Sequence, residues 1–171
     1  MAGLYAWKFG LPVSSFIAAM NSNNSLGDFV KDGTFSPGPF VRTKSPVLDV
    51  RIPSNLSRLA SFYGEAPAVM RNMVYPASID DELTLQTIES VWKKYRQRID
   101  PHTAVAFAAA ERTVAEQKWK GHTHTVVLAP MHYAKEADLV QRATGEKISI
   151  PERFRHIGRR ADPRRRYSPA A

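Results

Sequence analysis

The sequence predicts a helix-rich α/β fold in which a few parallel strands are covered by helices. Two short apolar runs, 13–20 and 123–129, are bounded by proline or Asn/Ser clusters, as buried strands are. Longer segments repeat apolar residues at helical spacing, and 171 residues suffice for one sizeable core. Strands that are apolar on both faces normally lie between neighbours in a parallel sheet. The chain therefore resembles one side of a larger α/β protein.

The first third of the chain combines short elements with one long connection. A helix is expected over 3–9, followed by the strand at 13–20. Ser25 is placed to cap a small helix that stops at Gly33, since glycine favours the left-handed conformation of a helix end. The segment 34–53 is rich in Pro and Ser, and such long irregular connections are usually functional or pack over another element.

Helices dominate the middle of the chain. Ser54 and Asn55 precede an apolar rhythm typical of a capped helix, while Pro67 and Pro76 are expected to break the segment that follows. The acidic run 80–82 favours a helix start, and the helix behind it carries an apolar face as far as Tyr95.

The most informative stretch runs from Ile99 to Glu111, an Asp-Pro-His-Thr loop that leads into an alanine-rich helix ending at about Gln117. Proline suits the first turn of a helix, and the side chain of Asp100, directly before it, can accept hydrogen bonds from the free backbone amides. Thr103 then lies in the first turn, where a rigidly held hydroxyl can be aimed at a ring nitrogen or an anion. The alternative is an ordinary capped helix with no ligand.

The last part of the chain offers a strand at 123–129 and an amphipathic helix at 134–143 that stops at Gly145. His122 and His124 would point to one face of that strand and could hold a metal. No third ligand is placed by the sequence, so solvated edge histidines are the preferred interpretation and no metal is expected.

Charge divides the chain into two parts. The net charge is +8, and residues 147–171 carry +6 of it, mostly on arginines. We expect a folded part at 1–152 and a basic, mobile tail at 153–171. Nucleic-acid or anion binding by the tail is the alternative, although Tyr167 alone offers base stacking there.

The composition also limits the compartment. The chain has no cysteine, no apolar run near the ~20 residues of a membrane span, and no signal-peptide order at its start. A cytoplasmic protein without membrane contact is expected.

An ordered series of motifs is similar to the threonine synthase family, pyridoxal-phosphate enzymes of the tryptophan-synthase-β-like fold (fold type II). The Asp-Pro-His-Thr-Ala-Val stretch resembles the family's own motif. The resemblance covers roughly residues 2–152 and continues, in the family's order, through Ala-Gly-Leu-Tyr-Ala-Trp-Lys-Phe-Gly from Ala2, Phe-Ile-Ala-Ala-Met-Asn-Ser-Asn from Phe16, Ser-Pro-Val-Leu-Asp-Val from Ser45, Ile-Pro-Ser-Asn-Leu-Ser-Arg-Leu from Ile52 and His-Tyr-Ala-Lys from His132.

The resemblance implies the C-terminal portion of an enzyme that converts O-phospho-L-homoserine and water to L-threonine and phosphate. Of the family's cofactor contacts, the partner of the pyridine nitrogen carries over, and it falls on Thr103. A neutral hydroxyl there is expected to leave the ring nitrogen largely unprotonated. Lys31 lies in a Phe-Val-Lys-Asp run that imitates the surroundings of the family's Schiff-base lysine, but its place in the series does not match.

The family's Schiff-base lysine and glycine-rich phosphate loop would precede the matched region. No catalytic residue is therefore assigned, and the isolated chain is expected to be inactive without a partner that supplies the N-terminal half. His132 and Lys135 fall where a substrate phosphate could bind, yet Tyr133 and Glu136 depart from the family there, so no role is assigned. The nearest alternatives are a threonine dehydratase-like lyase of the same fold type and a non-enzymatic anion-binding protein.

Overall fold

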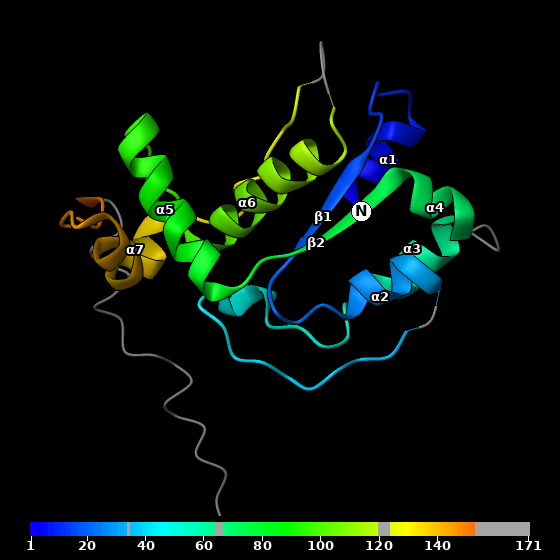
Figure 1. Cartoon of the computed structure of the whole chain (residues 1–171), viewed down its shortest axis with the longest axis horizontal. Coiled ribbons are helices and arrows are strands. Elements are labelled where there is room, and N and C mark those ends of the chain that lie inside the picture. The colour runs from blue at the N-terminus through cyan, green and yellow to red at the C-terminus, as the bar shows by residue number, and fades with distance from the viewer. Residues whose placement is uncertain (34, 64–66, 120–123, 153–171) are drawn as a thin grey trace, which may run out of the picture.

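A computed structural model describes residues 1–33, 35–63, 67–119 and 124–152. At its centre lie two parallel strands, β1 (Phe16–Met20) and β2 (Val74–Ser78), which pair in register along their whole length. Helices cover both faces of this small sheet (Figure 1). The predicted helix-rich α/β class with few parallel strands is confirmed.

Side chains of β1 alternate between the two helical layers. Phe16 and Ala18 pack into the layer formed by the first four helices, and Ile17 and Ala19 pack toward the long helix α6 (Pro101–Glu116) on the other face. Successive residues of a strand point to opposite faces, so an apolar residue at every position buries both faces.

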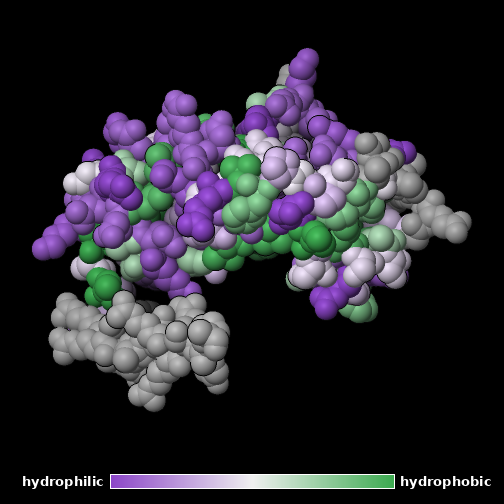
Figure 2. All heavy atoms as spheres, turned by 90° about the horizontal axis from the view of Figure 1, so that it is seen from below, coloured by the Kyte–Doolittle hydropathy of each residue, from purple (hydrophilic) through white to green (hydrophobic). Residues whose placement is uncertain are grey.

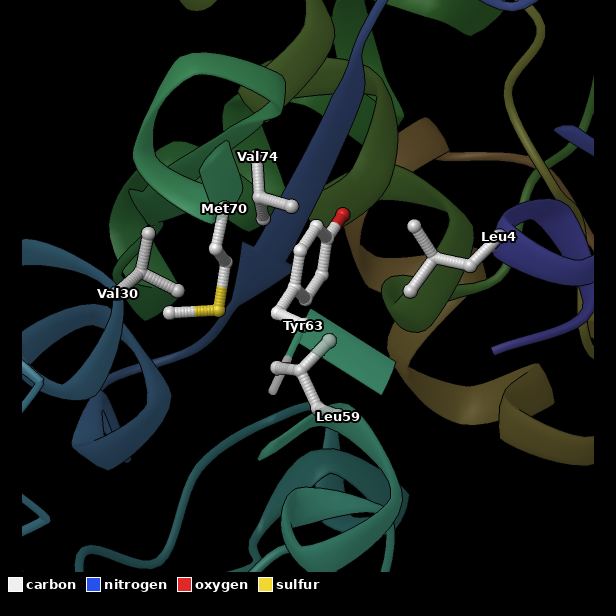
Figure 3. Packing of buried hydrophobic residues seen from close by; sticks show 6 residues of the cluster. All are labelled: Leu4, Val30, Leu59, Tyr63, Met70 and Val74. Carbon is white, nitrogen blue, oxygen red and sulfur yellow. The ribbon is translucent and has the colours of Figure 1, made fainter. Parts of the chain in front are cut away.

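The first layer consists of four short helices, α1 (Ala2–Lys8), α2 (Ser25–Asp32), α3 (Leu56–Tyr63) and α4 (Pro67–Met73). None of them is long enough to be stable alone, so their apolar faces must pack together. Figure 3 shows the resulting cluster, in which the ring of Tyr63 lies among aliphatic side chains. Its members are Leu4, Val30, Leu59, Tyr63, Met70 and Val74.

The second layer is built on α6, which packs against β1 and against α5 (Asp81–Tyr95). Farther from the sheet lie the 3₁₀ turn η2 (Tyr133–Glu136) and α7 (Ala137–Thr144). A second apolar cluster ties these helices together through Ile88, Ala104, Leu139, Val140 and Ile148.

One expected strand is absent and one unexpected strand is present. The strand predicted at 123–129 is wrong for 124–129, which have no regular structure and leave Val126 81% exposed. Residue 123 lies outside the described residues. The segment around Pro76, expected to be a break, contains β2 instead, because the nitrogen of Pro76 faces away from β1 and no ladder bond is lost there.

The sequence predicts the end of α2 correctly but not its start. Gly33 ends α2 in the left-handed conformation at φ 83°, as expected. Ser25, however, is the first residue of α2, and its hydroxyl donates to the carbonyl of Arg51, 2.7 Å away. The connection 35–53 is irregular as predicted, apart from the 3₁₀ turn η1 (Pro46–Leu48).

Two further expectations concern features of the whole chain. Among the described helices, none combines the length and the hydropathy needed to cross a bilayer. The basic tail at 153–171 lies outside the described residues, so its expected mobility stays a prediction.

Candidate functional site

The start of α6 is organised by one buried carboxylate. Asp100 occupies the N-cap and is 1% exposed. Its Oδ1 accepts from the backbone amides of His102 at 2.9 Å and Thr103 at 3.3 Å. The cap predicted from the sequence is confirmed. Amides and the positive end of the helix dipole stabilise a charge that burial alone would disfavour.

The imidazole of His102, also buried, joins this carboxylate to a distant loop. Its Nε2 accepts from the backbone N–H of Val47 at 3.1 Å, so the ring proton must lie on Nδ1. Nδ1 is 2.8 Å from Oδ1 of Asp100 and donates to it. Within the described residues, the side chain paired with this carboxylate is therefore a neutral imidazole rather than a lysine or arginine.

The hydroxyl of Thr103 completes the cluster. It donates to Oδ2 of Asp100, and the side chain is buried. Because the only hydroxyl proton is used in that bond, the oxygen can interact with a further group only as an acceptor.

A second polar network holds the loop that reaches His102. Asn21, directly after β1, donates from Nδ2 to Oδ1 of Asp49 at 2.8 Å and to the hydroxyl of Thr43 at 2.8 Å. Asp49 also accepts from the hydroxyl of Thr43 at 2.6 Å and from its amide at 3.0 Å. The segment 43–49 is thereby fixed between the carboxyl end of β1 and the start of α6.

The other candidates from the sequence lie elsewhere. Lys31 is exposed on α2, and His124 is exposed, while His122 falls outside the described residues. Over the described ranges, no three His, Asp or Glu side chains come together as a metal site would require. His132 caps η2 by accepting from the amide of Ala134 at 3.1 Å.

The sequence predicts the cap by Asp100 but not the roles of His102, Asn21 and Asp49. A histidine in the first turn of an alanine-rich helix was a usable signal, because a buried polar ring needs partners. Its partner Val47 lies 55 residues away in sequence, and no local sequence pattern predicts that contact.

The chain is similar in sequence to known proteins of one family. A family model described as "Threonine synthase, C-terminal" matches residues 103–168. The threonine synthase of Escherichia coli strain K12 is 34% identical over 161 residues, which are 94% of this chain and 35% of that protein. The threonine synthase of Saccharomyces cerevisiae is 28% identical and covers 92% of this chain, which spans 39% of it.

Solved structures give the same result. The crystal structure of the Escherichia coli threonine synthase superposes with a TM-score of 0.76 at 33% identity, over 88% of this chain and 34% of that chain. The structure of pyridoxal-phosphate-bound threonine synthase from Brucella melitensis gives a TM-score of 0.79 at 29% identity, over 94% of this chain and 39% of that one.

The fold is of the helix-rich α/β class, with a two-stranded parallel sheet and a buried aspartate cap at the start of α6. In sequence and in structure, the chain matches the C-terminal portion of the threonine synthase family. It spans about a third of the length of the curated relatives it matches.

Proposed function

We propose that this chain provides the C-terminal part of a pyridoxal-phosphate-dependent threonine synthase. The reaction is the conversion of O-phospho-L-homoserine and water to L-threonine and phosphate, and we assign it to the cytoplasm. The proposal rests on the 34% identity to the Escherichia coli enzyme across 94% of the chain. Residues 1–152 carry this role, and we propose none for the basic tail.

The start of α6 suits one contact with the cofactor. We assign Thr103 as the partner of the pyridine nitrogen, and its oxygen is restricted to accepting because Asp100 takes its proton. An accepting oxygen fits a protonated ring nitrogen, which reverses the expectation from the sequence that the nitrogen stays largely unprotonated. When bound, pyridoxal phosphate supplies the electron sink, and a protonated ring strengthens it.

Asp100 and His102 act on Thr103 rather than on a ligand. Two amides and the imidazole hold Oδ1 of Asp100, so the other oxygen is fixed toward the hydroxyl of Thr103. Turning that hydroxyl toward a neutral ring nitrogen would leave a buried carboxylate oxygen without a donor. Such a loss costs about 1–3 kcal/mol. The donor arrangement therefore favours the protonated ring.

The chain matches about a third of the length of its relatives, and the other part of the enzyme needs a surface on this chain to pack against. Large apolar side chains are exposed on the connection between α2 and α3, among them Val47 at 61% and Ile52 at 66%. Figure 2 views the molecule from the side on which this connection lies and shows hydrophobic side chains at its surface. We propose that the N-terminal part of the enzyme covers these residues.

The names of the relatives favour this function over a dehydratase-like lyase, since those reported above are threonine synthases. The basic anion-binding alternative rests on residues 153–171, which the structure does not describe. It would be supported by salt-sensitive nucleic-acid binding that is lost on truncation after Pro151.

Complementation tests the proposal. This chain would be co-expressed with the N-terminal two thirds of the Escherichia coli threonine synthase in a strain that lacks its own enzyme. We expect growth without added threonine for the pair and none for either part alone. The purified pair should release phosphate from O-phospho-L-homoserine.

A covalent fusion of the same two parts serves as a second test, because it does not depend on their association. A fusion that is folded and binds pyridoxal phosphate but releases no phosphate from O-phospho-L-homoserine would contradict the proposed function.

A further inference from the structure

A hollow of about 390 Å³ lies where α5 and α7 pack against each other, and the connection between α2 and α3 supplies the rest of its wall. The two helices lie side by side in Figure 1, away from the β1–β2 sheet. None of the residues that line the hollow belongs to the cluster of Asp100, His102 and Thr103. Its volume falls within the range of small-molecule sites in proteins. The hollow therefore has room for a small molecule at a distance from the start of α6.

One part of the wall is apolar. Leu85 of α5 lines it together with Leu139 and Ala143, which share one face of α7. All three side chains also pack into the apolar cluster that joins the two helices. An apolar group placed in the hollow would be removed from water against these side chains, which favours its binding.

The rest of the wall carries charges of both signs. Glu82 and Glu89 come from α5, and Arg142 comes from α7. Lys44 comes from the connection between α2 and α3. Over the described ranges, no salt bridge joins either of these acids to either of these bases. A wall whose opposite charges do not pair with each other suits a ligand that carries both charges itself.

The two carboxylates differ in the partners they already have. Glu89 forms an ion pair with Lys93, one turn farther along α5. Glu82 accepts from the neutral amide of Gln86 at 3.2 Å, and no cation pairs with it among the described residues. A carboxylate has about four acceptor positions, so most of those on Glu82 stay available. An ammonium group would therefore bind to Glu82.

The two bases are held from outside the hollow. Nε of Arg142 donates to the carbonyl of Asp138 at 3.2 Å, and its terminal nitrogens have no partner within the described part of the chain. The backbone amide of Lys44 donates to Oδ1 of Asp81 at 2.8 Å, which holds Lys44 beside the first turn of α5, next to Glu82. A guanidinium and an ammonium with unused donors form charge-assisted hydrogen bonds with a carboxylate.

We propose that this hollow binds a free α-amino acid with an apolar side chain. Glu82 binds its ammonium group, and Lys44 and Arg142 bind its carboxylate. Its side chain packs against Leu85 and Leu139. A ligand with one sign of charge would face two like charges in the same wall, so a zwitterion is favoured. The site goes beyond the proposed function, since none of these residues has a role assigned in that reaction.

Titration with L-leucine, followed through the NMR shifts of the backbone amides of the isotope-labelled chain, tests the proposal. L-Leucine carries both charges and an apolar side chain. We expect saturable shifts confined to α5, α7 and the segment around Lys44, with a dissociation constant of about 1 mM.

Two analogues test whether both charges are recognised. 4-Methylpentanoate is leucine without its ammonium group, and 3-methylbutylamine is leucine without its carboxylate. Each should bind about tenfold more weakly than L-leucine, the effect of one lost charge-assisted hydrogen bond.

Variants assign each charge to its partner. Glu82→Gln should bind L-leucine no more tightly than 4-methylpentanoate, because the partner of the ammonium group is gone. Arg142→Gln should weaken the binding of L-leucine by about tenfold and leave that of 3-methylbutylamine unchanged. Asp28→Asn and Arg71→Gln are matched controls, which remove an exposed acid from a first helical turn and an exposed base from a last turn elsewhere. Both controls should bind L-leucine as the parent chain does.

Three results would overturn the inference. L-Leucine could leave α5 and α7 unshifted well above the expected dissociation constant, or shift amides elsewhere in the chain. Either analogue could bind as tightly as L-leucine, which would show that the hollow does not recognise a zwitterion. The control variants could weaken binding as much as Glu82→Gln and Arg142→Gln do, which would make the effect one of net charge. None of these results bears on the proposed function, which phosphate release by the covalent fusion decides.

Discussion

The imidazole Nε2 of His102 accepts a hydrogen bond from the backbone N–H of Val47 at 3.1 Å, across 55 residues of sequence. The other ring nitrogen donates to Asp100, which in turn accepts from Thr103. One neutral histidine thus positions both the connection between α2 and α3 and the first turn of α6.

Replacing His102 should cost more than replacing the exposed His132. His102→Ala leaves the amide of Val47 and one bond of Asp100 unsatisfied, so the free energy of unfolding should fall by about 2–4 kcal/mol. His132→Ala removes a solvent-exposed cap and should cost about 1 kcal/mol or less. Urea unfolding of both variants measures the difference, and equal losses would mean that the His102 bonds contribute nothing.

The two aspartate caps offer a matched comparison. The side chain of Asp100 is buried and accepts four hydrogen bonds, whereas the side chain of Asp80 is exposed and accepts one, from the amide of Leu83. Asp80→Ala should lower stability by about 1 kcal/mol. Asp100→Ala should lower it by about 3 kcal/mol, because His102 and Thr103 also lose their acceptor. A loss at Asp100 no greater than that at Asp80 would contradict the hydrogen-bond network.

Tyr63 carries a hydroxyl that is buried with no partner among the described residues. Tyr63→Phe should therefore keep the stability at neutral pH or raise it by up to about 1 kcal/mol. A loss of 2 kcal/mol or more, roughly the value of a satisfied buried hydroxyl, would show that this oxygen has a partner. Tyr5→Phe, at a side chain that is 46% exposed, is the control.

The same residue predicts a dependence on alkaline pH. Burial raises the pKa of the Tyr63 phenol above its ordinary value of 10.0. The folded state therefore holds this proton more tightly than the unfolded chain does. Its contribution to stability is complete below about pH 10 and is lost as the pH rises from there through the folded-state pKa. Unfolding measured at about pH 9 and pH 11 should show a smaller decrease for Tyr63→Phe than for the parent chain.

Local signals in the sequence predict the helices well. Asp80, Asp100 and Gly33 have short-range partners within their own helices, so each acts where its spacing indicates. Strands depend on a second segment far away in sequence. The apolar run at 124–129 has no neighbouring strand among the described residues and remains irregular. Pro76 is tolerated because β1 lies on its other side.

The residues of the site show the same difference between local and distant interactions. The cap of Asp100 and the position of Thr103 follow from an Asp-Pro-His-Thr run that folds locally. That the hydroxyl oxygen of Thr103 can only accept a further hydrogen bond does not follow from this run. It depends on how Asp100 is held by the other groups around it. The loop at 43–49 is likewise placed by Asn21 and Asp49, which lie 28 residues apart.

The central claim is that the oxygen of Thr103 accepts from the ring nitrogen of the cofactor, and one comparison of variants tests it. The rate of phosphate release from O-phospho-L-homoserine would be measured for the covalent fusion with Thr103→Val and with Thr103→Ser. Serine keeps the oxygen and should retain activity within about fivefold, whereas valine should lower kcat by about a hundredfold. Equal rates for the two variants would contradict the claim.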